Sequence, residues 1–264
     1  MITIMKRHSV LAALLCAGAL SACGDPAVNT ITEPPSASSR IRFFHFGVGA
    51  PGVNFYANDT KMTAINSATG TESTTGTVYS AVAAGGAYSV IAPGQYNLTG
   101  RIAAATDKDL AIASVPATIG DGAYYSFYLS GIYSTATKTS DAFIVVDPVA
   151  PPTDFSVATV RFVHAISNAN PMTLYAMDTI TKVEVAVGSE VSYKGAGSFT
   201  AIPRGVYDLR TRYAGEATNR MTRLAVTFLG GRVYTITARG DITVAATSAC
   251  AATNRTCLDF SFNR

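Results

Sequence analysis

The stretch Ile41-Arg42-Phe43-Phe44-His45 occurs twice in this chain, because it returns in the second half as Val160-Arg161-Phe162-Val163-His164. The match extends well beyond this stretch. At the same spacing the chain repeats Phe55-Tyr56-Ala57 as Leu174-Tyr175-Ala176, and further on it repeats Gly122 through Gly131 as Gly231 through Gly240. A colinear match over roughly a hundred residues is typical of two copies of one domain, not of a short-period solenoid. The sequence therefore predicts a duplicated domain.

The composition allows each copy to bury a core of its own. Of the 264 residues, 48% are hydrophobic and only 14% are charged, against about 25% charged residues in typical globular chains. The formal net charge is +3, and it falls to about +1 if Lys6 and Arg7 are removed with an export signal. A chain this close to neutral lacks the basic excess that binds nucleic acid. We therefore expect no nucleic-acid partner.

Residues 1–22 are typical of an export signal. Lys6 and Arg7 supply a positive start, and an apolar run follows from Val10 to Leu20. This run is too short for a transmembrane helix, which needs about 20 apolar residues. Met5 is an alternative start of the chain, since the charged region would remain intact.

The end of this run, Leu20-Ser21-Ala22-Cys23, resembles the lipobox of bacterial lipoproteins. The resemblance implies that the signal is cut before Cys23 and that this cysteine carries acyl chains such as palmitate, which anchor the protein in a membrane. Gly24 is not the aspartate that favours retention in the inner membrane, so the resemblance favours the outer membrane of a bacterial cell envelope. The alternative is an ordinary cleaved signal with a chance cysteine. Residues 23–39 are rich in Pro, Ser and Thr, which predicts a lipidated flexible tether.

Residues 40–148 predict the first β-sandwich. Short runs rich in Val, Ile, Tyr, Phe and Thr alternate with turn residues, which is typical of strands. Within 95–103, Tyr96, Leu98 and Ile102 share one face and polar side chains the other, as in an antiparallel sheet with one buried side. Many short strands in about 110 residues favour an antiparallel β-sandwich. The expected strands are 40–46, 53–57, 77–82, 87–92, 95–103, 109–115, 123–131 and 141–147.

A proline-dense linker, residues 149–154, precedes the second β-sandwich, residues 155–247. In its strand 221–228, we expect Leu224, Val226 and Phe228 to face inward. The whole chain is thus predicted to be all-β, with two tandem antiparallel β-sandwich domains. The expected strands of the second copy are 158–165, 172–177, 181–187, 198–202, 206–213, 221–228, 232–239 and 242–246.

The last segment, residues 248–264, leaves the repeated pattern. Cys250 and Cys257 are the cysteines that remain once Cys16 departs with the signal and Cys23 is acylated. Because disulfides persist in exported proteins, we expect these two to pair in a hairpin whose last strand, about 256–262, closes an edge of the second sandwich. A loop this small contributes roughly 2–3 kcal/mol. Two thiols with no histidine nearby do not make a zinc site.

Each copy resembles a known bacterial domain. The resemblance is carried by Arg-Phe-Val-His-Ala at 161–165, by the pair Leu174-Tyr175, and by Pro203-Arg204-Gly205-Val206-Tyr207-Asp208-Leu209. These motifs are similar to those of DUF4397, a domain of unknown function in exported and lipoprotein-type bacterial proteins. The resemblance covers 160–240 well and 41–131 more loosely. It implies a β-sandwich of immunoglobulin-like or transthyretin-like type and supplies no activity.

His45 and His164 are the histidines that remain after the signal, one at the equivalent place in each copy. As functional groups they would be ligands or general bases. As structural groups they would be partly buried and bonded to the backbone of a neighbouring strand or loop. One histidine per copy, without a second histidine or a cysteine, is too few for a metal site. We favour the structural interpretation.

Two further patterns lack the context of a functional site. Gly47-Val48-Gly49-Ala50-Pro51-Gly52 matches Gly-x-Gly-x-x-Gly, but a strand follows it instead of a helix, so we expect a loop and no phosphate site. Asp107 and Asp109 predict a solvated turn, with a weak calcium contact as the alternative. The sequence contains no hydrolase, metalloprotease or P-loop motif. We therefore expect no enzyme activity, no catalytic residues, no cofactor and no metal.

Tyr124 and Tyr128 are the alternative for a binding site, because they share one side of the strand expected over 123–131. If exposed, they would form a platform for glycan or cell-wall sugars. The main hypothesis is a non-catalytic structural or protein-binding, adhesion-type role, through loops or an exposed strand edge. The expected partners are the membrane, through the lipid anchor, and an envelope protein or glycan.

Overall fold

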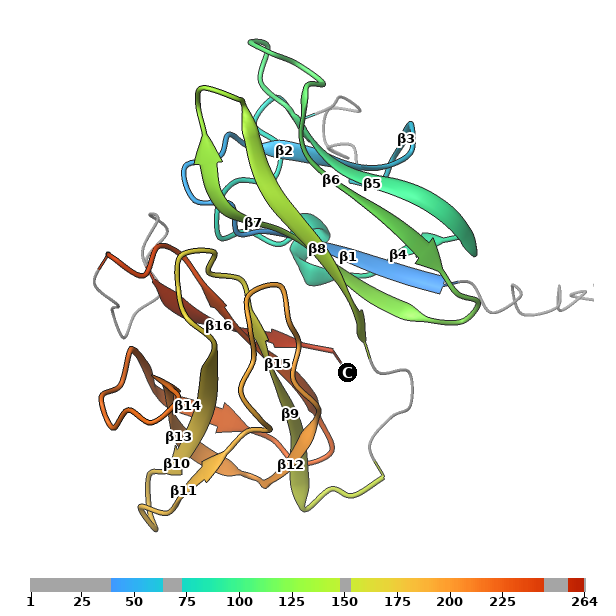
Figure 1. The fold of residues 1–264 in the computed structure, drawn as a ribbon. Coiled ribbons are helices and arrows are strands. Elements are labelled where there is room, and N and C mark those ends of the chain that lie inside the picture. Colours follow the sequence, from blue (N-terminus) through green and yellow to red (C-terminus); the bar gives the residue numbers. More distant parts are fainter. Residues whose placement is uncertain (1–38, 64–72, 148–152, 245–255, 264) are drawn as a thin grey trace, which may run out of the picture. The chain divides into compact units, whose positions relative to one another are not determined.

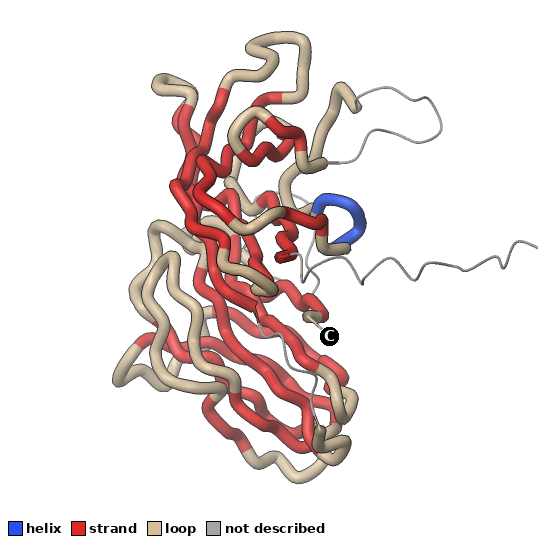
Figure 2. Tube along the Cα trace, turned by 90° about the vertical axis from the view of Figure 1, so that its right-hand side faces the viewer, coloured by secondary structure: helices blue, strands red, loops and turns tan. Residues whose placement is uncertain are grey.

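The computed structural model describes residues 39–63, 73–147, 153–244 and 256–263, and within them the predicted all-β class is confirmed. Figure 1 shows strands β1–β8 in the first half of the chain and β9–β16 in the second. The short helical turn η2 (Ala83–Gly86) can be seen among strands and loops in Figure 2. Within the described ranges, no helix has the length and apolar character needed to cross a membrane.

The first sandwich, β1–β8, contains two four-stranded sheets. All neighbouring strands in them are antiparallel except β1 and β7, which are parallel. One sheet has the order β4 (Ser89–Ile91), β1 (Ser39–His45), β7 (Tyr124–Ser134), β8 (Thr139–Asp147), and the other has the order β3 (Thr60–Lys61), β2 (Val53–Ala57), β5 (Gly94–Ile102), β6 (Ala111–Ile119).

The second sandwich, β9–β16, repeats this topology strand for strand. Its single parallel pair, β9 and β15, corresponds to β1 and β7. The duplication seen in the sequence is therefore also a duplication of sheet order. The sheets have the orders β12 (Thr200–Pro203), β9 (Val157–His164), β15 (Val233–Arg239), β16 (Cys257–Phe262), and β11 (Glu184–Ala186), β10 (Met172–Asp178), β13 (Gly205–Tyr213), β14 (Met221–Phe228).

Two of the expected strands are wrong. In place of 242–246, residues 242–244 form a turn, because the Asp241 carboxylate accepts hydrogen bonds from the backbone and hydroxyl of Thr243. In place of 77–82, the chain makes only isolated bridges at Thr77 and Val82, and a left-handed residue, Ser80, interrupts the extended run.

The expected last strand of the chain is present as β16, and it takes the place that β8 has in the first sandwich. It pairs antiparallel with β15 and forms an edge of its sheet. The tail therefore supplies the eighth strand of the second copy. The predicted signal, most of the tether and linker, and residues 245–255 of the predicted hairpin lie outside the described residues.

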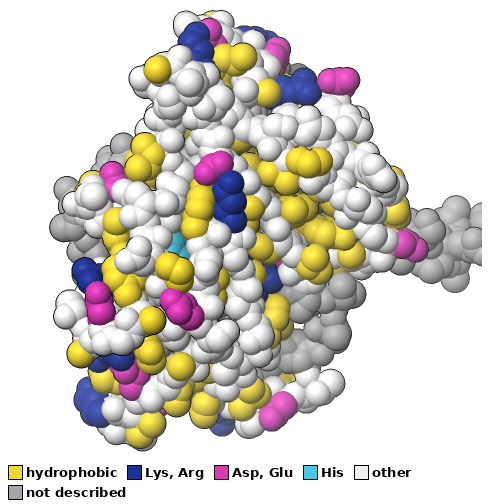
Figure 3. All heavy atoms as spheres, in the orientation of Figure 1, with side chains coloured by type: hydrophobic (Ala, Val, Ile, Leu, Met, Phe, Trp, Pro, Cys, Tyr) yellow, Lys and Arg dark blue, Asp and Glu magenta, His cyan; other side chains and the backbone are white. Residues whose placement is uncertain are grey.

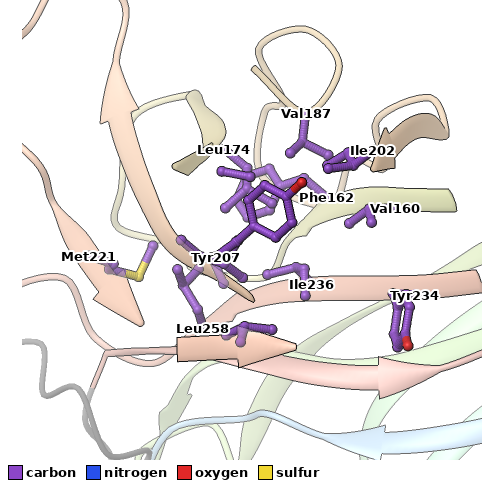
Figure 4. Packing of buried hydrophobic residues seen from close by; sticks show 14 of the residues in the cluster. Val160, Phe162, Leu174, Val187, Ile202, Tyr207, Met221, Tyr234, Ile236 and Leu258 are labelled. Atoms are coloured by element: carbon purple, nitrogen blue, oxygen red, sulfur yellow. The ribbon is translucent and has the colours of Figure 1, made fainter. Parts of the chain in front are cut away.

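Each sandwich has its own apolar core between its two sheets. In the second sandwich, Val160 and Phe162 from β9 pack against Leu174, Tyr207 and Ile236 (Figure 4). The corresponding first core contains Ile41, Phe43, Phe55, Leu98 and Phe127. Burial of one such side chain contributes about 1.5–3 kcal/mol.

A third apolar cluster joins the two sandwiches. Phe44, Tyr128 and Phe143 come from the first sandwich, and Val163 and Ala165 come from the second. Strands β1, β7, β9 and β15 are therefore covered on both faces over much of their length, so most of their residues are buried. The predicted pattern of one buried and one polar face holds in part for β5 in an outer sheet, where Leu98 and Ile102 are buried but Thr99 is buried as well. The pattern fails for the inner strands.

Leu224 does not face inward as predicted. It is 53% exposed, whereas Val226 and Phe228 are buried. The pairing of β14 with β13 shifts at this point, where Leu224 and Ala225 lie opposite the single residue Asp208. Ala225 has a positive φ of 54°, and its N–H donates to the Asp208 carboxylate. This β-bulge turns Leu224 to the outside.

Candidate functional site

The two histidines are structural, as expected. Both side chains are fully buried, and Nε2–H of His45 donates to the carbonyl of Pro51 at 2.9 Å. His164 makes the equivalent bond to Asn170 at 3.1 Å, and its Nδ1 accepts the N–H of Ile166. Burial lowers the pKa of both histidines below the usual 6.5. They are therefore neutral at pH 7, and their hydrogen bonds to backbone carbonyls hold a loop against each sandwich.

The prediction of an exposed Tyr124/Tyr128 platform is wrong. Tyr128 has no exposed surface, because its ring stacks between Phe44 and Phe143 in the cluster that joins the sandwiches. Tyr124 is only partly exposed, and its hydroxyl accepts a hydrogen bond from Arg40. Because Tyr128 is buried in the cluster between the sandwiches, the two tyrosines do not form an exposed platform for a sugar.

The acidic turn and the glycine-rich stretch are also as expected. Asp107 and Asp109 lie in an exposed turn, and Lys138 pairs with Asp107 at 2.7 Å. Residues 47–52 form the loop between β1 and β2. A Cβ at Gly52 would lie 1.9 Å from the carbonyl oxygen of Thr75, so close backbone approach explains that glycine. Within the described residues, no cluster of three metal-ligating side chains occurs.

The predicted cysteine sites lie largely outside the described residues. This applies to Cys23 and to Cys250. Cys257 begins β16 and is buried. The lipid anchor and the Cys250–Cys257 bridge therefore stay predictions.

A buried charge cluster that the strand pattern did not predict is centred on Asp147, the last residue of β8. Its side chain is fully buried and forms ion pairs with two arginines, Arg42 of β1 and Arg161 of β9. Ser126 and Tyr88 each donate a hydroxyl hydrogen bond to the same carboxylate at 2.6 Å. The signal was present in the repeated motif, where an arginine interrupts an otherwise apolar strand at the same place in both copies.

The cluster is itself duplicated. In the first sandwich, Arg42 donates to Ser126 and Ser126 donates to Asp147. In the second, Arg161 donates to Thr235 and Thr235 donates to Asn263. The strand pairings place Thr235 and Asn263 at the positions of Ser126 and Asp147. The two halves of the cluster differ at one charged position. Asn263 in the second sandwich has an amide where Asp147 in the first has a carboxylate.

Each arginine also reaches the opposite sandwich. Nη1 of Arg42 donates to the carbonyl of Phe262, and Nη1 of Arg161 donates to the carbonyl of Val146 at 2.6 Å. Phe262 and Val146 occupy equivalent places, one residue before Asn263 and Asp147. The contacts are therefore reciprocal. Since charge-assisted hydrogen bonds depend strongly on geometry, these arginines fix the register of the two sandwiches.

The cluster leaves one arginine nitrogen without a partner. Nη2 of Arg161 donates to Asp147, but among the described residues Nη2 of Arg42 has no acceptor. Arg42 is 1% exposed and lies between the rings of Phe44 and Tyr88. It lines a pocket of about 230 Å³ that also touches Phe262 and the loop at Gly85. Burial and the adjacent carboxylate of Asp147 raise the pKa of the Tyr88 hydroxyl.

A second candidate site is an apolar surface along β14, defined by Phe155, Val206, Leu224, Leu229 and Phe262. Each of these side chains is exposed, from 37% for Val206 to 71% for Phe155. Two adjoining grooves, of about 350 and 500 Å³, share Thr227 and Leu229 in the β14 region. This surface can bury apolar side chains of a partner but holds few groups for chemistry.

Charged side chains are dispersed over the face of the molecule shown in Figure 3. Most Lys and Arg side chains there lie singly or beside Asp and Glu. Independently of this view, Arg212 is paired with an acidic side chain: it contacts Glu184 at 2.6 Å and lies over the ring of Tyr175. A polyanion would meet no continuous basic patch on this face.

No family model matches the sequence, so the resemblance to DUF4397 stays a prediction. No curated protein matches it either. One solved structure with some likeness is the Bacillus anthracis TIE protein, with 14% identity over 77% of this chain, 33% of that chain and a TM-score of 0.24. Another is a candidate cell adhesion protein from Bacteroides ovatus, with 10% identity over 87% and 96% of the two chains and a TM-score of 0.25. This chain spans a third of the TIE protein, and likeness at this level carries no argument about function.

Proposed function

We propose that this chain is a non-catalytic module of the bacterial envelope, held by a lipid anchor at Cys23, that binds a protein partner along β14. The observation that carries the proposal is the β14 surface. Large apolar side chains there lie exposed around two adjoining grooves. Contiguous exposed apolar surface of this kind marks contact sites in soluble proteins.

A comparison of the two copies supports this surface as the binding edge. The equivalent strand in the first sandwich, β6, carries Pro116 opposite Asn97, and proline cannot donate a hydrogen bond to an added strand. In β14 the corresponding place holds the bulge with the outward-facing Leu224. Strand β14 ends its sheet. An apolar segment of a partner would thus find on β14 the exposed side chain of Leu224 and two grooves beside it.

The non-catalytic part of the proposal is supported by the histidines. His45 and His164 are buried, and their Nε2 atoms are committed to backbone carbonyls. Neither is placed to take a proton from a substrate, because a general base must reach the reacting group.

The test of partner binding is a paired substitution on the β14 surface. In Leu224→Lys/Leu229→Lys, two charges replace exposed apolar contacts, and we expect the affinity for an envelope protein partner to fall at least about tenfold. The control is Val78→Lys/Val90→Lys, which adds the same charge at exposed positions in the first sandwich. Partners are captured from separated protein and glycan fractions of the envelope, and then measured as purified proteins.

The outcomes of this test are distinct. Loss of a purified partner with the β14 pair and retention with the control pair would support the proposal. Equal binding by both variants would exclude β14 as the site. Capture from the glycan fraction alone would show that the module binds envelope sugars through another face.

The anchor is tested separately. Cys23→Ala removes the thiol that would be acylated, so we expect the protein to move from the membrane fraction to the soluble fraction. Ser21→Ala leaves the cysteine in place and should stay with the membrane. Cell fractionation measures whether the protein is membrane-bound, and the mass of the N-terminal peptide shows whether it is acylated. A Cys23→Ala protein that remains membrane-bound would refute the anchor.

A further inference from the structure

Each of the two grooves along β14 carries one charged side chain, and in both it is an arginine. Arg223 lines the groove of about 350 Å³, and Arg204 lines the groove of about 500 Å³. The other described residues around the grooves are apolar or aromatic side chains, glycines and one threonine, so no described carboxylate lines either groove. A chain that docks there therefore meets positive charge within an apolar surface.

Both arginines have surface that a partner can reach. Arg204 is exposed, and no carboxylate of the described residues pairs with it, whereas Arg212 of the same sheet pairs with Glu184. Arg223 is partly exposed, and its Nη1 donates to the carbonyl of Leu258 at 2.6 Å, which holds the guanidinium at the wall of its groove. A carboxylate of a partner can thus approach Arg204 from solvent.

The two cations are specific to the second copy. The strand pairings place Arg204 where the first copy has Pro93. They place Arg223 where the first copy has Val115, a residue packed against the apolar core. The second copy therefore carries positive charge at two positions where the first is apolar, along the same strand that carries its exposed apolar side chains.

We infer that the partner bound along β14 presents an acidic segment, in which carboxylates stand among large apolar side chains. The inference rests on the proposed function and names the chemistry of its partner. A guanidinium binds a carboxylate through two parallel hydrogen bonds, and the apolar walls bury the neighbouring side chains. A basic segment would be repelled at both grooves. The grooves share Thr227 and Leu229, so one segment can lie along both.

The first experiment is a selection of short random peptides, displayed on phage, against the mature protein. Peptides that also bind Leu224→Gln/Leu229→Gln are removed, because this pair takes away apolar contacts without adding charge. We expect Asp and Glu to exceed Lys and Arg in the peptides that remain, relative to the unselected library. An acidic peptide from this set is then synthesised, and its affinity is measured by isothermal titration calorimetry.

Charge reversal at one groove tests the role of its arginine. In Arg204→Glu we expect the selected acidic peptide to bind at least about fivefold more weakly at low ionic strength, because attraction becomes repulsion. The matched control is Lys108→Glu, which makes the same change of charge in an exposed turn of the first sandwich. This variant should bind the peptide as the wild type does.

Removal of charge tests the other groove. We expect Arg223→Gln to weaken binding of the same peptide, because the groove then holds no cation. Nη1 of Arg223 also bonds to Leu258, so circular dichroism first establishes that this variant is folded. Where it does not fold, Arg204→Glu, at its exposed position, decides alone.

The results separate the inference from the proposed function. Peptides that depend on Leu224 and Leu229 but show no acidic excess, or unchanged affinity in Arg204→Glu, would overturn the acidic partner and leave partner binding on β14 in place. Absence of any peptide that depends on these leucines would overturn both. A concentration-dependent dimer that Leu224→Gln/Leu229→Gln abolishes, measured by analytical ultracentrifugation, would show that a second copy covers the grooves and would also overturn the inference.

Discussion

At the scale of single residues, Asp147 shows how a polar group can hold two apolar domains in one arrangement. Its carboxylate accepts from Ser126 and Tyr88 and pairs with arginines from both sandwiches. An apolar cluster alone tolerates sliding, whereas hydrogen bonds to a carboxylate have fixed directions. The buried cluster thus specifies one register between the sandwiches.

We predict that Asp147→Asn lowers the free energy of unfolding by about 3–5 kcal/mol, because it leaves two buried guanidinium groups without a counter-charge. Urea denaturation of the mature protein measures the change. Asp121→Asn, at an exposed position, is the control and should change stability by less than about 0.5 kcal/mol. A loss as small as that of the control would mean that water, not Asp147, satisfies the arginines.

The buried histidines predict a loss of stability in mild acid. Burial lowers the pKa of His45 and His164 in the folded protein below 6.5, so the unfolded chain binds more protons as the pH falls below that value. Stability is therefore full above pH 6.5 and declines as the pH falls toward the folded-state pKa. Between about pH 7.5 and about pH 5.5 the decline is at most about 1.4 kcal/mol per histidine.

The measurement is urea denaturation at these two pH values. A protein with His45→Gln and His164→Gln should lose the pH dependence, whatever its absolute stability. The carboxyl groups of Asp178, Asp241 and Glu184 have pKa values held low by hydrogen bonds, so they do not titrate in this range. A wild-type protein equally stable at both pH values would show that the histidines are already protonated when folded.

Among individual residues, the sequence predicted the histidines correctly and missed the arginines. A lone histidine at the end of an apolar strand is commonly bonded to backbone, and that is the case here. The role of Arg42 and Arg161 depends on a carboxylate far away in sequence and on contact between the domains. Neither the distant carboxylate nor the contact between the domains can be deduced from the pattern of strands. For the same reason Tyr128 was misjudged, since its covering residues belong partly to the second sandwich.

At the scale of secondary structure, most strands follow from local sequence. Alternation in β5 and the Pro-x-Gly motif before β13 were sufficient to place those elements close to their bounds. The observed strands differ from the predicted ones where a bulge or a turn interrupts an apolar run. In β14 the bulge at Ala225 reverses the direction of Leu224, and no residue there signals it, because alanine rarely adopts positive φ.

Strand β16 carries a prediction of its own. It begins at Cys257, and we expect this cysteine to be bonded to Cys250. In the native protein both should resist iodoacetamide until a reductant is added, as measured by mass spectrometry of peptides. Reduction should then lower stability by roughly 2–3 kcal/mol, mainly by freeing the unfolded chain.

The control for this experiment is a protein with Cys250→Ser and Cys257→Ser, whose stability should not respond to reductant. Rapid labelling of both cysteines in the unreduced native protein would refute the bridge.

At the scale of the whole molecule, the duplication accounts for the main features described above. Each copy supplies one arginine, one Ser or Thr and one end of an edge strand to the shared cluster. The copies differ at their outer edges, where β6 has Pro116 and β14 has an apolar surface. The inner strands join the copies, and the outer edge strand β14 of the second copy carries exposed apolar side chains.

The reciprocal bonds of Arg42 and Arg161 have the form of an isologous contact, in which one patch meets its own copy across a two-fold axis. A single ancestral domain with this patch would associate as a homodimer, and fusion of two genes would make that association independent of concentration. A homodimer must carry the same residue in both halves. Asp147 in one half and Asn263 at the equivalent place in the other is an asymmetry open only to a fused pair, so a molecule that combines one carboxylate with one amide at these places requires the fusion.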